Sequence, residues 1–285
     1  MKLKLAKNRV IDLSVTKVMG TIALSENDKR SIDDLVMLAK SFVKAGAELL
    51  EVGARHSLGS VNENRVNSVI GAIINNVDVP VAVNSNNSQV IDQALRAGAS
   101  MVISTDGLRS PGVIDLLKSV DVPICLHYDQ SSRIDDDADV VASVSEFFFE
   151  RIDALLESGI QRKRLLIDPS VVNASIGNRL KLLGRLESFS SFALPVCIAL
   201  PRQIPDEDRF MKDNHVLTLT AALFCSSCKA VQIIRTADVS EVAIAIGFWQ
   251  LMSSKTKPFK LSKVIVRRLR NMRDAIHEFK TRKQQ

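Results

Sequence analysis

The sequence predicts a parallel α/β protein, and its count of elements fits a (β/α)₈ barrel. Short, continuous apolar runs alternate with longer runs of helical periodicity along most of the chain, and each apolar run has the composition of a strand buried on both faces. Eight strand–helix pairs can be counted in this alternation, which is the number that closes such a barrel. A doubly wound open sheet is the alternative that the same alternation allows.

The expected strands and helices follow one another without exception. Strands are predicted over residues 17–22, 48–54, 79–84, 101–104, 122–127, 165–168, 196–200 and 231–235. Helices are predicted over residues 31–45, 62–75, 88–97, 112–119, 143–158, 176–187, 216–228 and 240–252. Gly46, Gly98 and Gly159 stand where three of these helices should stop, because glycine readily takes the left-handed conformation of a helix C-cap.

Length and composition indicate one large domain with additions at both ends. The chain has 285 residues, and a single α/β barrel typically takes about 250. We expect a lead-in over residues 1–16, the barrel over 17–254, and a basic helical extension over 255–285. With 46% apolar and 25% charged residues, the chain can bury a sizeable core. Only four cysteines and no membrane-length apolar run are present, so we expect a reduced, cytoplasmic protein.

The positive charge is concentrated at the end of the chain. Residues 255–285 contain eleven basic and two acidic residues, whereas the preceding residues contain 27 and 30. Apolar residues recur at helical spacing through 261–279, which predicts an amphipathic helix. This helix either packs on the barrel or across a homodimer, or contacts nucleic acid, an anionic membrane or an acidic partner. Aromatic residues that stack on bases are scarce in it, so the sequence holds no strong nucleic-acid signal.

In a (β/α)₈ barrel, the active site lies at the C-terminal ends of the strands. Four polar residues end the predicted strands and are candidate ligand-binding residues: Asn84, His127, Asp168 and Arg235. Four more follow strand ends, namely Arg55, His56, Arg202 and Gln203. Of these, Gln203 is a candidate for ligand binding, and the other three are candidates for anion binding.

Each strand-end residue also has a purely structural interpretation. Asp168 either accepts N–H groups of a ligand or closes a turn with the residues after it. Arg235 either binds a ring or an anion, or pairs with Asp168 or Asp238. The run Asn84-Ser85-Asn86-Asn87 either contacts a ligand or forms a turn and helix N-cap, and His127 is either a site residue or a buried strand-end histidine. Elsewhere, the Cys225–Cys228 pair stands alone inside a helical run, and we expect no metal site.

Short motifs at the strand ends resemble those of dihydropteroate synthases. They include VMGTI at 18–22, AGAELLEVG at 45–53, IDP at 167–169 and IIR at 233–235, in family order and spacing over residues 17–253. The resemblance implies a (β/α)₈ barrel, often a homodimer. It also implies an enzyme that joins hydroxymethyl-dihydropterin pyrophosphate to p-aminobenzoate with the help of Mg²⁺. In this comparison, Asp168 matches a pterin-binding aspartate and Arg235 a ring- or anion-binding arginine.

The chain departs from the family mostly where the chemistry occurs. Ala23 stands where the family has Asn, Leu58 where it has Arg, Gln203 where it has Lys, and Ala237 where it has His. Asn84 replaces an aspartate, which removes a negative charge that would stabilise a developing cation. The loss of one such contact commonly costs about 10²–10³ in rate. We therefore expect a pterin-binding barrel with little or no synthase activity.

Three other functions stay open from the sequence. A divergent but active synthase would replace the lost phosphate contacts with Arg55, His56 or Arg202 and would use Mg²⁺. A non-enzymatic interaction protein would act through the basic extension. A pterin-dependent methyltransferase subunit shares the barrel type, although the first strand resembles the synthases more closely.

Overall fold

The computed structural model describes residues 1–6, 9–25, 28–54, 63–128, 134, 139–171, 174–200 and 214–253. Within these residues, eight parallel strands form a closed barrel in the order β10-β3-β4-β5-β6-β7-β8-β9. The strands are β3 (Lys17–Leu24), β4 (Leu49–Ala54), β5 (Val81–Asn84), β6 (Met101–Ser104), β7 (Ile124–His127), β8 (Leu165–Asp168), β9 (Val196–Ala199) and β10 (Val231–Thr236). The predicted (β/α)₈ barrel is confirmed, and the doubly wound alternative is wrong because the sheet closes on itself.

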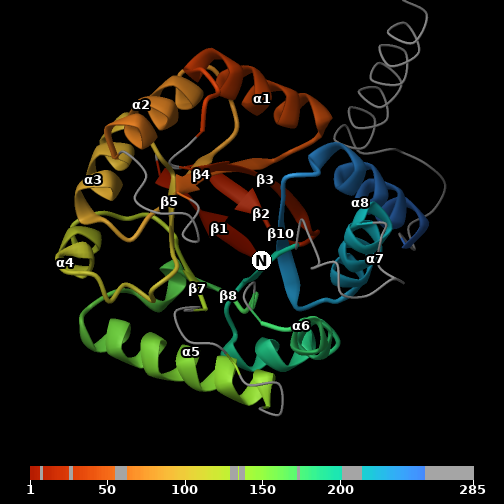
Figure 1. Cartoon of the computed structure of the whole chain (residues 1–285). Helices are drawn as coiled ribbons and strands as arrows, with labels where there is room; N and C mark the ends of the chain where they lie inside the picture. Colours follow the sequence, from red (N-terminus) through yellow and green to blue (C-terminus); the bar gives the residue numbers. More distant parts are fainter. Residues whose placement is uncertain are drawn as a thin grey trace, which may run out of the picture.

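The helices form a ring around the strands (Figure 1). They are α1 (Ile32–Ala45), α2 (Glu63–Ile74), α3 (Ser88–Ala97), α4 (Val113–Lys118), α5 (Val140–Glu157), α6 (Ile176–Leu183), α7 (Asn214–Ser227) and α8 (Val239–Ser253). Two short 3₁₀ helices, η2 (Arg162–Arg164) and η3 (Leu186–Phe192), precede β8 and β9. The helix predicted over residues 176–187 thus ends at Leu183, and part of its expected length belongs to η3. No described helix is both long and apolar enough to cross a bilayer.

Local capping residues fix the ends of several helices. Ser31 and Asp34 form a reciprocal capping box at the start of α1, in which each side chain accepts a backbone N–H of the other residue. Gly46 and Gly98 end α1 and α3 with φ values of 113° and 110°, and Gly159 after α5 has φ 96°. The predicted glycine stops therefore take the left-handed conformation that an L side chain rarely adopts.

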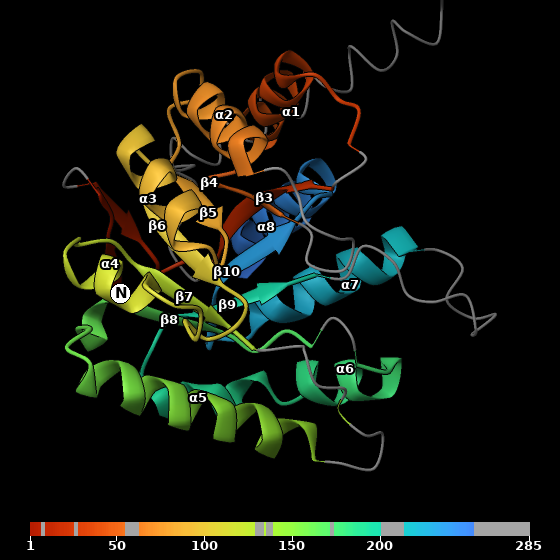
Figure 2. The same cartoon turned by 60° about the vertical axis from the view of Figure 1, so that its left-hand side comes forward.

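Residues 1–16, expected only as a lead-in, contain a small antiparallel hairpin of β1 (Lys2–Lys4) and β2 (Val10–Asp12). Leu3, Leu5 and Leu13 of this segment are buried in one cluster with the apolar side chains inside the barrel. Since residue 17 begins β3, the hairpin closes the N-terminal end of the barrel; Figure 2 shows it in dark red beside the strands. The apolar interior is therefore covered by the hairpin segment at its N-terminal end, and the buried polar side chains of the strands lie toward its C-terminal end.

Candidate functional site

The inward-facing side chains at the C-terminal ends of the strands form one polar layer. Side chains alternate along a strand, so a residue two positions after an interior residue also points inward. The interior cluster includes Met19, Leu49, Ala82, Cys125, Leu166 and Ile233. Two positions after them stand Thr21, Glu51, Asn84, His127, Asp168 and Arg235. All of the second set except Thr21 are buried, so the layer is polar, charged and shielded from water.

Arg235 of β10 lies at the centre of this layer, between two carboxylates from other strands. Its Nε donates to Glu51 Oε2 at 2.8 Å, and its Nη2 donates to Glu51 Oε1 at 2.8 Å. The third guanidinium nitrogen, Nη1, donates to Asp168 Oδ2. The bidentate contact with Glu51 matches the planar fork of a guanidinium, which fixes its orientation as well as its charge.

Neutral side chains and one backbone N–H group add further hydrogen bonds to both carboxylates. Glu51 also accepts from Asn84 Nδ2 at 2.6 Å and from Thr21 Oγ1 at 3.1 Å. Asp168 Oδ1 accepts from the Ser170 backbone N–H at 3.0 Å and from the Ser170 hydroxyl. Ser170 in turn accepts from the backbone N–H of Ala199 on β9 at 2.7 Å. The network thus joins β3, β4, β5, β8, β9 and β10.

The network carries a net negative charge. Burial by itself would raise the pKa of the Glu51 carboxyl, but the charge of Arg235 outweighs it and the net effect lowers that pKa. Burial would likewise raise the pKa of the Asp168 carboxyl, but the charge of Arg235 again outweighs it and the net effect lowers that pKa. Conversely, burial would lower the pKa of Arg235, but Glu51 and Asp168 raise it well above its ordinary value. Two ionised carboxylates therefore flank one guanidinium, and the three groups together carry a charge of about −1.

His127 and Asn84 add neutral hydrogen-bonding groups to the same layer. Burial lowers the pKa of His127 against the opposing charge of Asp168, so its imidazole is neutral at neutral pH. Asn84 donates to Glu51, but its Oδ1 atom is buried and has no hydrogen-bond partner among the described residues. A buried acceptor without a donor is costly, and a ligand N–H would satisfy it.

The structure thus brings together four of the eight residues proposed from the sequence: Asn84, His127, Asp168 and Arg235. Arg55, His56, Arg202 and Gln203 lie outside the described residues, as does the basic extension over 255–285. Two structural interpretations are confirmed. Asp168 closes a turn onto Ser170, and Arg235 pairs with Asp168.

Glu51 belongs to the centre of the site, although the sequence analysis did not propose it. It is 2% exposed and makes the bidentate contact with Arg235. In the sequence, Glu51 is recognisable as the one acidic residue within β4, where the residues on either side of it are apolar. A carboxylate on a strand buried on both faces needs a cationic partner, and that requirement identifies it as a member of a network.

The described residues do not fit a magnesium ion. Mg²⁺ binds carboxylate oxygens, but Glu51 and Asp168 are both paired with Arg235. Cys125, Asp168 and Cys197 have potential ligand atoms within 4.8 Å of one another. Two of these three ligand atoms are sulfur, however, whereas Mg²⁺ takes oxygen ligands, and burial raises the pKa of the Cys197 thiol. In the separate Cys225–Cys228 pair, burial raises the pKa of Cys225 to about 12, so this thiol is also protonated.

Comparisons with known proteins agree with this architecture. The family described as "Pterin binding enzyme" matches residues 21–236. Dihydropteroate synthase of Escherichia coli (strain K12) is 27% identical over 263 residues, covering 85% of this chain and 93% of the relative. The enzyme of Bacillus subtilis (strain 168) is 26% identical over 264 residues, covering 84% and 90%.

Solved structures show the same fold. Dihydropteroate synthase of Xanthomonas albilineans with 4-aminobenzoic acid superposes with a TM-score of 0.81 at 26% identity, covering 90% of this chain and 99% of that one. The Yersinia pestis synthase superposes with a TM-score of 0.75 at 24% identity, covering 88% and 98%. The family match spans well over half of the sequence. The chain therefore belongs to the pterin-binding enzyme family, as a homologue of the dihydropteroate synthases.

Proposed function

We propose that this protein binds a pterin-like ring at the C-terminal mouth of its barrel and has little or no dihydropteroate synthase activity. The observation that carries the proposal is the pairing of Arg235 with both Glu51 and Asp168. This pairing leaves the described layer rich in hydrogen-bond acceptors and poor in cations. Such a layer favours a ring that donates N–H groups over a phosphorylated substrate.

The acceptors of the layer suit the amino-pyrimidinone edge of a pterin. This edge presents adjacent N–H donors, as a guanidinium does, and a carboxylate accepts such donors well. Asn84 Oδ1 supplies a second acceptor that has no partner within the described residues. The net negative charge of the network further favours a ligand rich in N–H donors, because negative charge attracts the partly positive hydrogens of these groups.

Synthase chemistry needs positive charge where the pyrophosphate leaves, and the described site offers little. Arg235 is the one residue of the polar layer with a fixed positive charge, and two carboxylates already neutralise it. Ala23 and Ala237 occupy positions where the resemblance implies polar phosphate contacts. At about 10²–10³ in rate for each lost contact, two or more losses would reduce turnover severely, although such losses are not additive.

An active, divergent synthase is the competing function, and the similarity to curated synthases favours it. The two functions differ in one measurable respect, which is product formation. We would first titrate the full chain with 6-hydroxymethylpterin by calorimetry. We would then supply the dihydropterin pyrophosphate, p-aminobenzoate and Mg²⁺, and assay dihydropteroate by chromatography.

We expect binding of the pterin without product. Asp168→Asn should weaken binding at least tenfold, because it removes the charge that a ring N–H would contact. The matched control is Glu48→Gln, which removes a carboxylate paired with Lys17 at 3.0 Å near the opposite end of the barrel. Formation of dihydropteroate at a rate typical of enzymes would overturn the proposal that synthase activity is lost. Equal affinity in the wild type and Asp168→Asn, with both proteins folded, would overturn the assigned binding site.

A further inference from the structure

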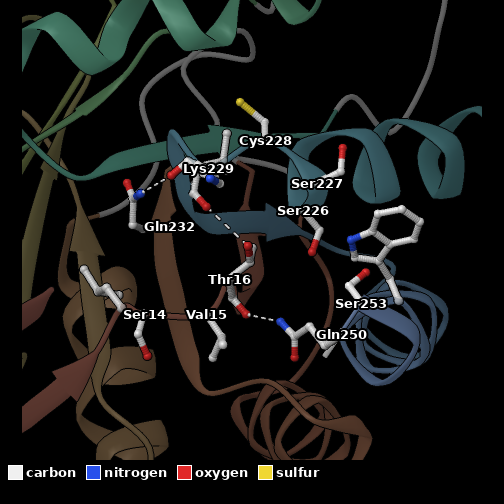
Figure 3. Close-up of a pocket in the computed structure, with 13 residues that line it drawn as sticks. Ser14, Val15, Thr16, Ser226, Ser227, Cys228, Lys229, Gln232, Gln250 and Ser253 are labelled. Carbon is white, nitrogen blue, oxygen red and sulfur yellow. Dashed lines mark hydrogen bonds between the residues drawn. The ribbon is translucent and has the colours of Figure 1, made fainter. Parts of the chain in front are cut away.

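A hollow lies at the N-terminal end of the barrel, away from the polar layer. Its volume is about 350 Å³, which falls within the range of small-molecule sites. The residues before β3, the C-terminal ends of α7 and α8, and the start of β10 line it (Figure 3). Val231 and Arg235 both belong to β10, so about 13 Å of extended strand separates this hollow from the candidate pterin site.

Hydrogen bonds within the lining fix the shape of the hollow. Thr16 Oγ1 donates to the Val231 carbonyl at 3.2 Å, and Gln250 Nε2 donates to the Thr16 carbonyl at 3.1 Å. Gln232 Nε2 donates to the Lys229 carbonyl at 3.0 Å, and its Oε1 accepts from the Val196 backbone N–H at 2.7 Å. Figure 3 marks the bonds within the lining. These contacts tie the walls to the barrel strands, so the hollow is formed before any ligand arrives.

Two polar groups of the lining are left for a ligand. The Ser226 hydroxyl oxygen is buried and has no hydrogen-bond partner among the described residues. The Lys229 side chain is exposed and takes part in none of the ion pairs found in the described part of the chain. The lining contains no acidic residue, and Ser253 adds a further hydroxyl, whereas the Ser227 hydroxyl already donates to the Phe224 carbonyl at 2.7 Å. This set of donors is complementary to a small anion.

The remaining wall is apolar and includes an aromatic ring. Leu13, Val15, Val231 and Trp249 line it. An indole ring favours a flat aromatic partner, either stacked or edge-on. An apolar wall beside a cluster of donors fits a molecule that has a ring on one side and an oxyanion on the other.

We propose that this hollow is a second ligand site, which takes a small aromatic carboxylate. The ring packs against Trp249, and the carboxylate accepts from Lys229 and from the Ser226 hydroxyl. The site is separate from the proposed pterin site, because the two occupy opposite ends of the barrel.

The chain has one tryptophan, and it lines the hollow. A signal from this side chain therefore reports on the hollow. We would incorporate 5-fluorotryptophan into the full chain and follow its single ¹⁹F resonance while adding benzoate. A probe of this size should bind with a Kd of about 1 mM. Benzamide, which is neutral and has nearly the same shape, should bind at least tenfold more weakly because it lacks the charge.

Three variants make the outcome specific. Lys229→Gln should weaken benzoate binding about tenfold and leave benzamide unchanged, and Ser226→Ala should weaken benzoate severalfold. Lys163→Gln is the matched control, because it removes an exposed lysine from η2, before β8, and Lys163 does not line the hollow. A benzoate-induced shift that survives Lys229→Gln, or that benzamide reproduces at equal concentration, would overturn the proposal. Absence of any shift up to 20-fold above the expected Kd, about 20 mM benzoate, would overturn it as well.

Discussion

Arg235 illustrates how a buried cation can lose its freedom to bind ligands. An arginine at the end of a barrel strand is suited to phosphate recognition, because its five N–H groups form a rigid fork. Here three of its nitrogens already donate to Glu51 and Asp168. Releasing it toward a phosphate would leave two buried carboxylates without a counter-charge, which typically costs about 3–5 kcal/mol. The fold therefore stabilises the arginine in its paired position.

The paired carboxylates predict how stability depends on pH. Because the pKa of Glu51 is lowered in the folded state, the unfolded chain binds more protons below its ordinary value of 4.5. This contribution is complete above that value and is lost as the pH falls through the folded-state pKa. In Glu51→Gln, the free energy of unfolding should therefore fall less steeply below pH 4.5, by up to about 1.4 kcal/mol per pH unit.

Urea denaturation of the wild type and of Glu51→Gln at a series of acid pH values measures this difference. At neutral pH, the variant should be less stable by about 3 kcal/mol, because Arg235 keeps only one charged partner. Parallel pH profiles for the two proteins would show that Glu51 is not ionised beside Arg235.

At the scale of the elements, the sequence predicted the helix and strand boundaries that depend on a local pattern of residues. Strands β6 and β8 match their predicted bounds, because each is a continuous apolar run between breakers. The glycine stops were predicted because they depend on φ at single residues. The β1–β2 hairpin was missed, because its three-residue strands are too short for a periodic signal and it is stable only against the barrel. Glu51 was missed for a related reason, since its partner lies 184 residues away.

The close approach of β4 and β5 makes Gly53 a sensitive position. Gly53 pairs with Asn84 in the sheet, and a Cβ atom at Gly53 would lie 2.3 Å from the Asn84 backbone oxygen. Gly53→Ala should therefore separate the two strands and displace the Asn84 amide from Glu51. We expect a loss of about 1–3 kcal/mol in the free energy of unfolding, together with weaker pterin binding.

Gly71 offers the matched control for this substitution. It lies inside α2, and a Cβ atom there would meet nothing within 4 Å. Gly71→Ala should stabilise the protein by about 0.5–1 kcal/mol, because alanine loses less entropy than glycine in a helix. Urea denaturation of both variants checks the pair, and equal effects of the same sign would contradict the steric argument.

At the scale of the whole molecule, the outer face of α8 is unusually apolar. Ile244, Phe248 and Met252 are 39%, 58% and 61% exposed, and their spacing of four residues places them on one side of the helix. On neighbouring α7, Phe224 and Val216 are also exposed, at 48% and 57%. Several large apolar side chains exposed on neighbouring helices are typical of an interface between protein chains.

We expect this face to join two copies of the chain, as the sequence resemblance implied. Phe248→Lys should shift the protein from dimer to monomer in sedimentation velocity at micromolar concentration, because it places a charge within the apolar stripe. Phe149→Lys is the control, since Phe149 is 57% exposed on α5, a different helix. A wild type that sediments as a monomer, or dimers of both variants, would contradict this assignment of the interface.

The hairpin that closes the barrel has a consequence for how the protein is made. Leu3 and Leu5 leave the ribosome before every strand of the barrel, yet they are buried in one cluster with side chains that include Ile233 of the last strand. A hairpin of two three-residue strands is not stable alone in water. It can dock only after β10 has been synthesised and has closed the barrel. These two leucines precede every barrel strand in synthesis and are therefore shielded from solvent only after the last strand is made.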